Sequence, residues 1–162
     1  MFNVGILTIS DKGSKEERKD LSGKVIEEIL IKNNYSILEY NIIPDEQDII
    51  EKELIKLSDE KKVDLILTTG GTGFSKRDVT PEATINVATK LVPGIAEAMR
   101  AYSLNITKRA MLSRAASVIR NNTLIINLPG SPKAVTESLE YIITELDHGL
   151  KILTGKDSEC AR

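Results

Sequence analysis

Residues 63 to 84, VDLILTTGGTGFSKRDVTPEAT, contain an apolar run, a glycine-rich turn and a threonine–proline pair in direct succession. The apolar run 63–68 is short and mostly aliphatic, which is typical of a strand buried on both faces. Thr80 and Pro81 indicate a hydroxyl N-cap followed by proline at the first helical position. The stretch therefore predicts a buried strand, a tight turn and a helix, the repeating unit of a parallel sheet covered by helices.

Outward from this unit, apolar runs alternate with amphipathic segments along the chain. The run 116–128, ASVIRNNTLIINL, has two β-rich halves around Asn121 and Asn122, which tolerate the positive φ of a tight turn. It predicts a hairpin with one antiparallel edge strand. The other expected elements are strands at 2–9, 35–43 and 63–68 and helices at about 16–33, 46–61, 81–91, 94–106 and 132–153.

The predicted fold class is therefore α/β, a three-layer α/β/α arrangement around a mostly parallel sheet. We expect residues 1–155 to form a single domain and residues 156–162 to form a short tail. Of the 162 residues, 41% are hydrophobic and 28% are charged, which suits one globular domain with a substantial core.

Charge and sequence pattern disfavour several classes of partner. The formal net charge of −2 gives no whole-chain attraction to nucleic acid or to anionic lipid. Residues 1–4 run into the first expected strand without a charged leader, and no apolar run is long enough to cross a bilayer, so we expect a cytoplasmic protein with no membrane partner. The lone Cys160 can form neither an internal disulfide nor a thiolate metal cluster, and the lone His148 is expected to be structural.

Small residues, cations and carboxylates follow each expected parallel strand. The carboxyl ends of parallel strands share one edge of a sheet, where ligands bind in the crevice, so we expect these residues to lie on one rim. They are Ser10, Asp11, Lys12 and Gly13 after the first strand, Pro44, Asp45 and Glu46 after the second, residues 69–73 with Lys76, Arg77 and Asp78 after the third, and residues 129–133 after the last.

Two of these junctions predict the start of a helix beside glycine. Thr80 precedes Pro81 and Ser131 precedes Pro132, and a helix amino terminus offers unpaired N–H groups and partial positive charge to an anion. Either junction alone is an ordinary strand-to-helix turn of an α/β chain. Together with the nearby aspartates they favour a site for phosphates and an oxygen-seeking Mg²⁺.

The common nucleotide fingerprints are absent. From Gly71 the pattern GTGFSK has Lys76 where a dinucleotide site requires its last glycine. Gly155 and Lys156 are followed by Asp157 and therefore do not complete a P-loop. A typical dehydrogenase or P-loop enzyme is not supported.

Five separated motifs, in order, resemble the MogA/MoaB family of molybdenum cofactor biosynthesis, and the resemblance extends from about residue 3 to residue 153. The motifs are IPDEQ (43–47), TTGGTGFSKRDVTPEAT (68–84), PGIAEAMR (93–100), MLSRA (111–115) and LPGSPKA (128–134).

The resemblance implies an enzyme that adenylylates molybdopterin. The terminal phosphate of molybdopterin would attack the α-phosphorus of Mg²⁺-ATP, giving adenylyl-molybdopterin and pyrophosphate. Asp45 and Asp78 match the family's catalytic aspartates and are expected to hold Mg²⁺ on the ATP phosphates. The substrate- and phosphate-binding residues expected from the rim and the resemblance together are Ser10, Asp11, Thr69, Gly70, Gly71, Thr72, Gly73, Ser113, Arg114, Gly130, Ser131 and Lys133.

This assignment agrees with the chemistry of phosphoryl-type transfer. Such a reaction asks the protein mainly for positioning and charge neutralisation, so amide-lined loops, a carboxylate-held metal and a cation such as Arg114 or Lys133 suffice without a protein nucleophile. Lys76 and Arg77 remain open between exposed loop cations and phosphate contacts.

The resemblance carries further expectations and leaves alternatives. It implies assembly as a homotrimer or hexamer and hand-over of the product to a separate molybdate-insertion protein. One alternative is a non-catalytic molybdopterin-binding or scaffold protein with the same pocket. Another is a signalling receiver, which would need a phospho-accepting aspartate after the third strand, where Thr68, Thr69 and Gly70 stand instead.

Overall fold

The computed structural model describes residues 1–156, and within them six strands form one sheet with the order β2-β1-β3-β6-β5-β4. Strands β1, β2, β3 and β6 run parallel, whereas β5 is antiparallel to both β6 and β4. The expected tail lies outside the described residues, Lys156 excepted, and so does Cys160. The strands are β1 (Asn3–Ile9), β2 (Ser36–Ile43), β3 (Leu65–Thr69), β4 (Lys90–Leu91), β5 (Ser117–Arg120) and β6 (Thr123–Leu128).

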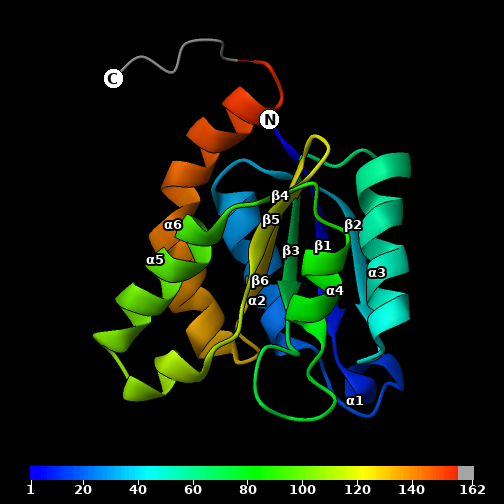
Figure 1. Cartoon of the computed structure of the whole chain (residues 1–162), viewed down its shortest axis with the longest axis vertical. Coiled ribbons are helices and arrows are strands. Elements are labelled where there is room, and N and C mark those ends of the chain that lie inside the picture. The colour runs from blue at the N-terminus through cyan, green and yellow to red at the C-terminus, as the bar shows by residue number, and fades with distance from the viewer. Residues whose placement is uncertain (157–162) are drawn as a thin grey trace.

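Helices cover both faces of this sheet (Figure 1). Helices α2, α5 and α6 pack on one face, and α3 and α4 pack on the other. A π-helical turn, Lys56–Glu60, extends α3, and a 3₁₀ turn, Lys108–Leu112, follows α5. The helices are α1 (Asp11–Ser14), α2 (Leu21–Lys32), α3 (Gln47–Ile55), α4 (Thr80–Asn86), α5 (Pro93–Leu104) and α6 (Pro132–Leu153).

Alternation along the central strands builds two hydrophobic cores. In β3, Leu65 and Leu67 join the core under α2, α5 and α6, whereas Ile66 joins the core under α3 and α4. Strand β6 divides in the same way, with Ile126 on the first side and Ile125 on the second. Because both faces are covered, these strands are apolar at successive positions, as the sequence pattern predicted.

The three-layer α/β fold with a mostly parallel sheet is confirmed. The hairpin of β5 and β6 is confirmed too, with Asn121 at φ 52° in its turn. Strand β5 is not the outermost strand, however, because the short strand β4 pairs beyond it. The helix expected at 81–91 ends at Asn86, because Lys90 and Leu91 are extended and pair with β5 as strand β4.

The boundary expected at residue 16 was also wrong. Helix α2 begins at Leu21, because the Asp20 side chain accepts a hydrogen bond from the backbone N–H of Gly23 and caps the helix there. The preceding expected helical residues form turns and a short connection after α1. Within residues 1–156, no helix combines the length and the apolar character that crossing a membrane requires.

Candidate functional site

A cleft of about 560 Å³ opens where β1, β3 and β6 end. Its position follows from the parallel order of these strands, which brings their carboxyl ends to one edge. The structure brings together here the following residues singled out from the sequence: Ser10, Gly13, Asp45, Thr69, Gly70, Gly71, Asp78, Gly130 and Ser131.

Glycine is required along one wall of the cleft. Gly70 and Gly71 have φ angles of 96° and 68°, in the left-handed region that side chains disfavour. A Cβ atom at Gly70 would lie 2.3 Å from the carbonyl oxygen of Ile9, and one at Gly71 would lie 2.2 Å from Thr80 Oγ1. The bare backbone therefore passes close to the end of β1 and lines the cleft.

The two expected helix starts differ in the structure. Ser131 caps α6 as predicted, since its Oγ accepts a hydrogen bond from the N–H of Ala134 at 3.2 Å. Thr80 is not a cap: it is the first residue of α4, it is fully buried, and its hydroxyl donates to the carbonyl oxygen of Gly70 at 2.9 Å. The Thr80 hydroxyl thus holds the glycine turn in place, and the start of α6 borders the cleft with a side-chain cap, as do the starts of α1 and α2.

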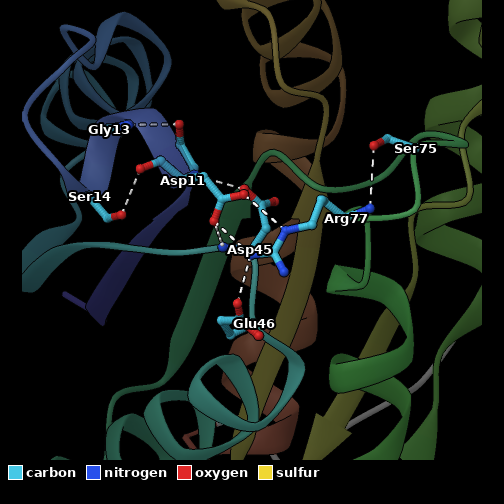
Figure 2. Close-up of polar contacts among 8 residues, drawn as sticks. Asp11, Gly13, Ser14, Asp45, Glu46, Ser75 and Arg77 are labelled. Carbon is cyan, nitrogen blue, oxygen red and sulfur yellow. Dashed lines mark hydrogen bonds and ion pairs between the residues drawn. The ribbon is translucent and has the colours of Figure 1, made fainter.

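Asp11 and Asp45 are interlocked at one side of the cleft (Figure 2). The N–H of Asp11 donates to Asp45 Oδ2 at 2.8 Å, and the N–H of Asp45 donates to Asp11 Oδ1 at 3.1 Å. Burial, together with the charges of Asp11 and Asp78, raises the pKa of Asp45 above its ordinary value, against the opposing effect of the Asp11 N–H. A cation placed beside Asp45 would relieve this unfavourable charge.

Asp78 lies in the loop between β3 and α4 and contacts two earlier residues of that loop. Its Oδ2 accepts a hydrogen bond from the N–H of Ser75 at 3.0 Å and lies so near Gly73 that a Cβ there would be 2.8 Å away. One carboxylate oxygen of Asp45 and one of Asp78 accept no hydrogen bond from the described part of the chain.

The carboxylates of Asp45 and Asp78 fit a magnesium ion that takes its other ligands from a bound phosphate and from water. Between residues 1 and 156, no group of three or more His, Cys, Asp or Glu side chains is arranged to hold a metal ion. Mg²⁺ in phosphate-transfer sites commonly uses one or two carboxylates and takes its other ligands from phosphates and water. Asp45 and Asp78 are the carboxylates in the cleft that could hold it.

Arg77 is already engaged by carboxylates. Its Nε donates to Asp11 Oδ2 at 3.0 Å, and its Nη2 donates to Asp11 Oδ1 at 2.9 Å and to Glu46 Oε1 at 2.7 Å (Figure 2). The hydrogen bond from Arg77 holds the pKa of Asp11 below its ordinary value. Both oxygens of Asp11 are therefore occupied, which leaves Asp11 poorly placed to bind a metal or a phosphate.

A smaller and more apolar hollow of about 310 Å³ lies beside the glycine loop. The expected residues Thr72, Gly73 and Ser113 line this hollow rather than the first cleft. Residues 69–73 thus form a wall that borders both spaces. The apolar side chains lining the hollow are Ala96, Met99, Ala110, Leu112, Ala115, Pro129 and Ala134.

Arg114 and Lys133 line neither hollow. Arg114 donates to the carbonyl oxygens of Gly73 at 2.7 Å and Asp78 at 2.8 Å and pairs with Glu82. Its guanidinium thus supports the 73–78 loop by binding a carbonyl group at each end of it. Lys133 is exposed in the first turn of α6, and Lys76 is exposed in the loop.

Several residues of the cleft were not anticipated from the sequence. Asp20 accepts hydrogen bonds from the hydroxyls of Thr8 at 2.6 Å and Tyr40 at 2.5 Å, and Ser22 donates to the carbonyl oxygen of Gly130 at 2.7 Å. An aspartate directly before Leu21 was a usable signal, since Asp is a preferred N-cap. The unanticipated residues of the cleft lining are Thr8, Ile9, Arg18, Lys19, Asp20, Leu21 and Ser22, whereas Pro132 belongs to the rim expected from the sequence.

Comparisons with known proteins show the family of this chain. Residues 5–148 match the family model described as a probable molybdopterin binding domain. The molybdopterin adenylyltransferase of Helicobacter pylori (strain J99) is 47% identical over 156 residues, covering 95% of this chain and 89% of that protein. The enzyme of the same description from Escherichia coli (strain K12) is 47% identical over 143 residues, covering 87% of this chain and 73% of that protein.

Solved structures show the same architecture. The molybdopterin biosynthesis enzyme MoaB from Thermus thermophilus superposes with a TM-score of 0.92 at 47% identity, covering 98% of this chain and all of that one (100%). The tungsten cofactor synthesizing protein MoaB from Pyrococcus furiosus gives 0.86 at 35% identity, covering 93% and 96% of the two chains. The chain belongs to the MogA/MoaB family of molybdopterin-binding proteins.

Proposed function

We propose that this protein is a molybdopterin adenylyltransferase, a nucleotidyltransferase of molybdenum cofactor biosynthesis. It transfers AMP from ATP to the terminal phosphate of molybdopterin and releases pyrophosphate. The observation that carries the proposal is the convergence of Asp45 and Asp78 on one cleft bordered by the glycine turn. The 47% identity to adenylyltransferases over nearly the whole chain supports the same reaction.

The chain's own groups suit a transfer between two phosphates. The attacking group is the phosphate of molybdopterin, so the protein needs no nucleophile of its own. Backbone groups of residues 69–71 and the start of α6 would position the polyphosphate, because a bare turn and a helix amino terminus both direct N–H groups to anions. The proposed chemistry therefore depends on positioning and on charge.

Asp45 and Asp78 are the proposed holders of Mg²⁺. When bound, Mg²⁺ would neutralise phosphate charge and favour a fixed geometry of the transferred group. Their uncompensated carboxylate oxygens and the raised pKa of Asp45 support this assignment. Asp11, by contrast, is assigned to supporting Asp45, because Arg77 occupies both of its oxygens.

Positive charge for the phosphates would come from Arg18 and Lys19. Both line the cleft, and neither pairs with a carboxylate in the part of the chain that the structure describes. Arg114 and Lys133, the cations expected from the sequence, are less suited, since Arg114 supports the loop and Lys133 lies outside both linings. The apolar hollow beyond the glycine wall suits the flat ring of one substrate.

Assembly and partners complete the proposal. We expect a homotrimer or a hexamer, and the exposed apolar side chains Leu104, Ile106, Met111 and Leu112 near the end of α5 support a buried contact between copies. We expect the adenylylated product to pass to a separate molybdate-insertion protein. We expect the proposed reaction to take place in the cytoplasm.

Purified protein tests this function directly. Incubation with molybdopterin, ATP and Mg²⁺ is expected to give adenylyl-molybdopterin and pyrophosphate in equal amounts. Tight binding of molybdopterin without any heat of ATP binding in calorimetry would instead support a scaffold protein. Absence of the adenylylated product under these conditions would refute the proposal.

A further inference from the structure

Arg77 links the two proposed metal-binding carboxylates although it contacts neither side chain. Its backbone directly precedes Asp78 in the chain, and its side chain crosses to Asp11, which is interlocked with Asp45. Figure 2 shows the guanidinium lying between the 75–77 segment and the ends of β1 and β2. One side chain therefore connects three segments that are distant in sequence.

The hydrogen bonds show how this link reaches Asp45. The N–H of Asp11 donates to Asp45 Oδ2. The Asp11 carboxylate, which is held by the two-pronged contact of Arg77, accepts in turn from the N–H of Asp45. A bidentate arginine–carboxylate pair fixes orientation as well as distance. Displacement of the Asp11 carboxylate would thus release the N–H of Asp45 and loosen the backbone that carries the Asp45 carboxylate.

Local structure on the Asp11 side does not provide a substitute for this contact. Helix α1 has only four residues, and its cap consists of Ser10 Oγ accepting from the N–H of Gly13 at 3.0 Å, with Ser14 Oγ donating to the carbonyl oxygen of Asp11. These bonds hold the backbone of the turn but leave the Asp11 carboxylate to Arg77 and to the N–H of Asp45. Without Arg77, the negative charges of Asp11, Asp45 and Glu46 would repel one another.

We infer that Arg77 is a positioning residue, which sets the Asp45 carboxylate relative to Asp78 through Asp11 and does not bind substrate phosphate. The inference rests on the proposed function, because it assigns Arg77 to a reaction that uses Asp45 and Asp78. Engagement of its Nε and Nη2 by two carboxylates distinguishes it from the cleft cations Arg18 and Lys19.

The kinetic test compares Arg77→Gln and Arg77→Lys with a matched control, Arg120→Gln. Arg120 makes an equivalent two-pronged contact with Asp59, through Nε at 3.1 Å and Nη2 at 2.6 Å, but it lies at the end of β5 away from the cleft. Arg77→Gln is expected to lower kcat by about 10- to 100-fold with KM for ATP within about twofold, as for other supporting residues of metal sites. Arg77→Lys should recover part of kcat, since it restores charge without the fork, and Arg120→Gln should retain wild-type kinetics.

Two kinetic results would overturn the inference. A large rise in KM for ATP with kcat unchanged would mean that Arg77 binds phosphate, and wild-type kinetics in Arg77→Gln would mean that Arg77 has no role. A loss of the same size in Arg120→Gln would show that any broken ion pair harms the enzyme.

A second measurement needs no turnover. Amide hydrogen exchange in the free protein reports the hydrogen bonds donated by the N–H groups of Asp11 and Asp45. Arg77→Gln should speed exchange at both amides by at least about tenfold, and Arg120→Gln should not. Unchanged exchange in Arg77→Gln would overturn the inference. A wild-type protein without activity would refute the proposed function while this exchange result still decided the role of Arg77.

Discussion

At the residue scale, the site depends on a few positions. At some of them the backbone leaves no room for a side chain, and at others a backbone N–H orients the carboxylate. Gly70 has a positive φ and lies against the carbonyl oxygen of Ile9. In Asp45 and in Asp78, one carboxylate oxygen accepts from a backbone N–H and the other accepts no hydrogen bond within residues 1–156, which suits the proposed Mg²⁺. Binding geometry is thus built from local backbone contacts, and single substitutions can test each of them.

Gly70→Ala should destabilise the protein. The added Cβ would lie 2.3 Å from the Ile9 carbonyl oxygen and would require a strained φ, so we expect a loss of about 1–3 kcal/mol in the free energy of unfolding. Gly94→Ala is the control, because a Cβ there meets no atom within 4 Å and the residue lies in the first turn of α5. Urea unfolding at neutral pH measures both, and an equal effect of the two substitutions would contradict the strain argument.

At the element scale, polar side chains attach the helices to the sheet. Asn127 in β6 is fully buried, and its amide donates to Thr68 Oγ1 at 3.0 Å and to Thr84 Oγ1 at 2.9 Å while its Oδ1 accepts from the N–H of Ala116. These bonds join β3, β6, α4 and the residue before β5. The amide thereby fixes α4, and with it the end of the 70–80 loop.

Asn127→Leu should cost about 3 kcal/mol of stability, since it leaves the buried hydroxyls of Thr68 and Thr84 and the half-buried N–H of Ala116 without their partner. Asn122→Ala, in the exposed hairpin turn, should change the free energy of unfolding by less than about 0.5 kcal/mol. Urea unfolding again provides the comparison. A loss below about 1 kcal/mol in Asn127→Leu would show that the apolar side chain compensates for the missing hydrogen bonds.

Elements whose pattern is local were predictable from the sequence, and contacts between distant segments were not. Helix α6 begins at Pro132 and ends at Leu153 as expected, because Ser131 and a long apolar stripe define it locally. The extent of β4 depends on pairing with β5, and the role of Thr80 depends on the carbonyl group of Gly70. Helical periodicity therefore extended α4 too far, and the Thr80–Pro81 pair predicted a cap that the structure does not have.

The site shows the same limit. The rim could be predicted because parallel strands end on one side, and this rule brought Asp45, Asp78 and Gly70 to one cleft. The engagement of Arg77 with Asp11 could not, since these residues are separated by 66 positions and only the folded chain brings them together. Arg114 was assigned to substrate charge for the same reason, although its partners lie in the glycine loop.

At the scale of the whole molecule, the two ends of the sheet differ in structure. The carboxyl ends of the parallel strands form the cleft, whereas the opposite end is closed by the β5–β6 turn and an ion pair between Arg120 and Asp59. The hydrogen bond from Arg120 is the main cause that holds the pKa of Asp59 below its ordinary value of 3.8. Substitutions in this ion pair therefore test the stability of the protein without changing the cleft.

Arg120→Gln should lower stability by about 1 kcal/mol at neutral pH. The pKa of Asp59 is depressed in the folded protein, so its contribution is present above the unfolded value of 3.8 and is lost as pH falls through the folded value. The difference between wild type and Arg120→Gln should therefore shrink as pH falls below about 4. Urea unfolding at a series of pH values measures it, and a difference that stayed constant to the lowest pH would exclude the ion pair as its cause.

The measurement that most directly tests the central claim is turnover by wild type, Asp45→Asn and Asp78→Asn in the same assay. Mass spectrometry would follow adenylyl-molybdopterin formed from molybdopterin, ATP and Mg²⁺, with Asp48→Asn as control because Asp48 is an exposed residue of α3. We predict product with wild type and Asp48→Asn, and about 100-fold or greater loss of turnover with retained molybdopterin binding in the other two variants. Undiminished turnover in both Asp45→Asn and Asp78→Asn, or no adenylylated product from the wild type, would contradict the account.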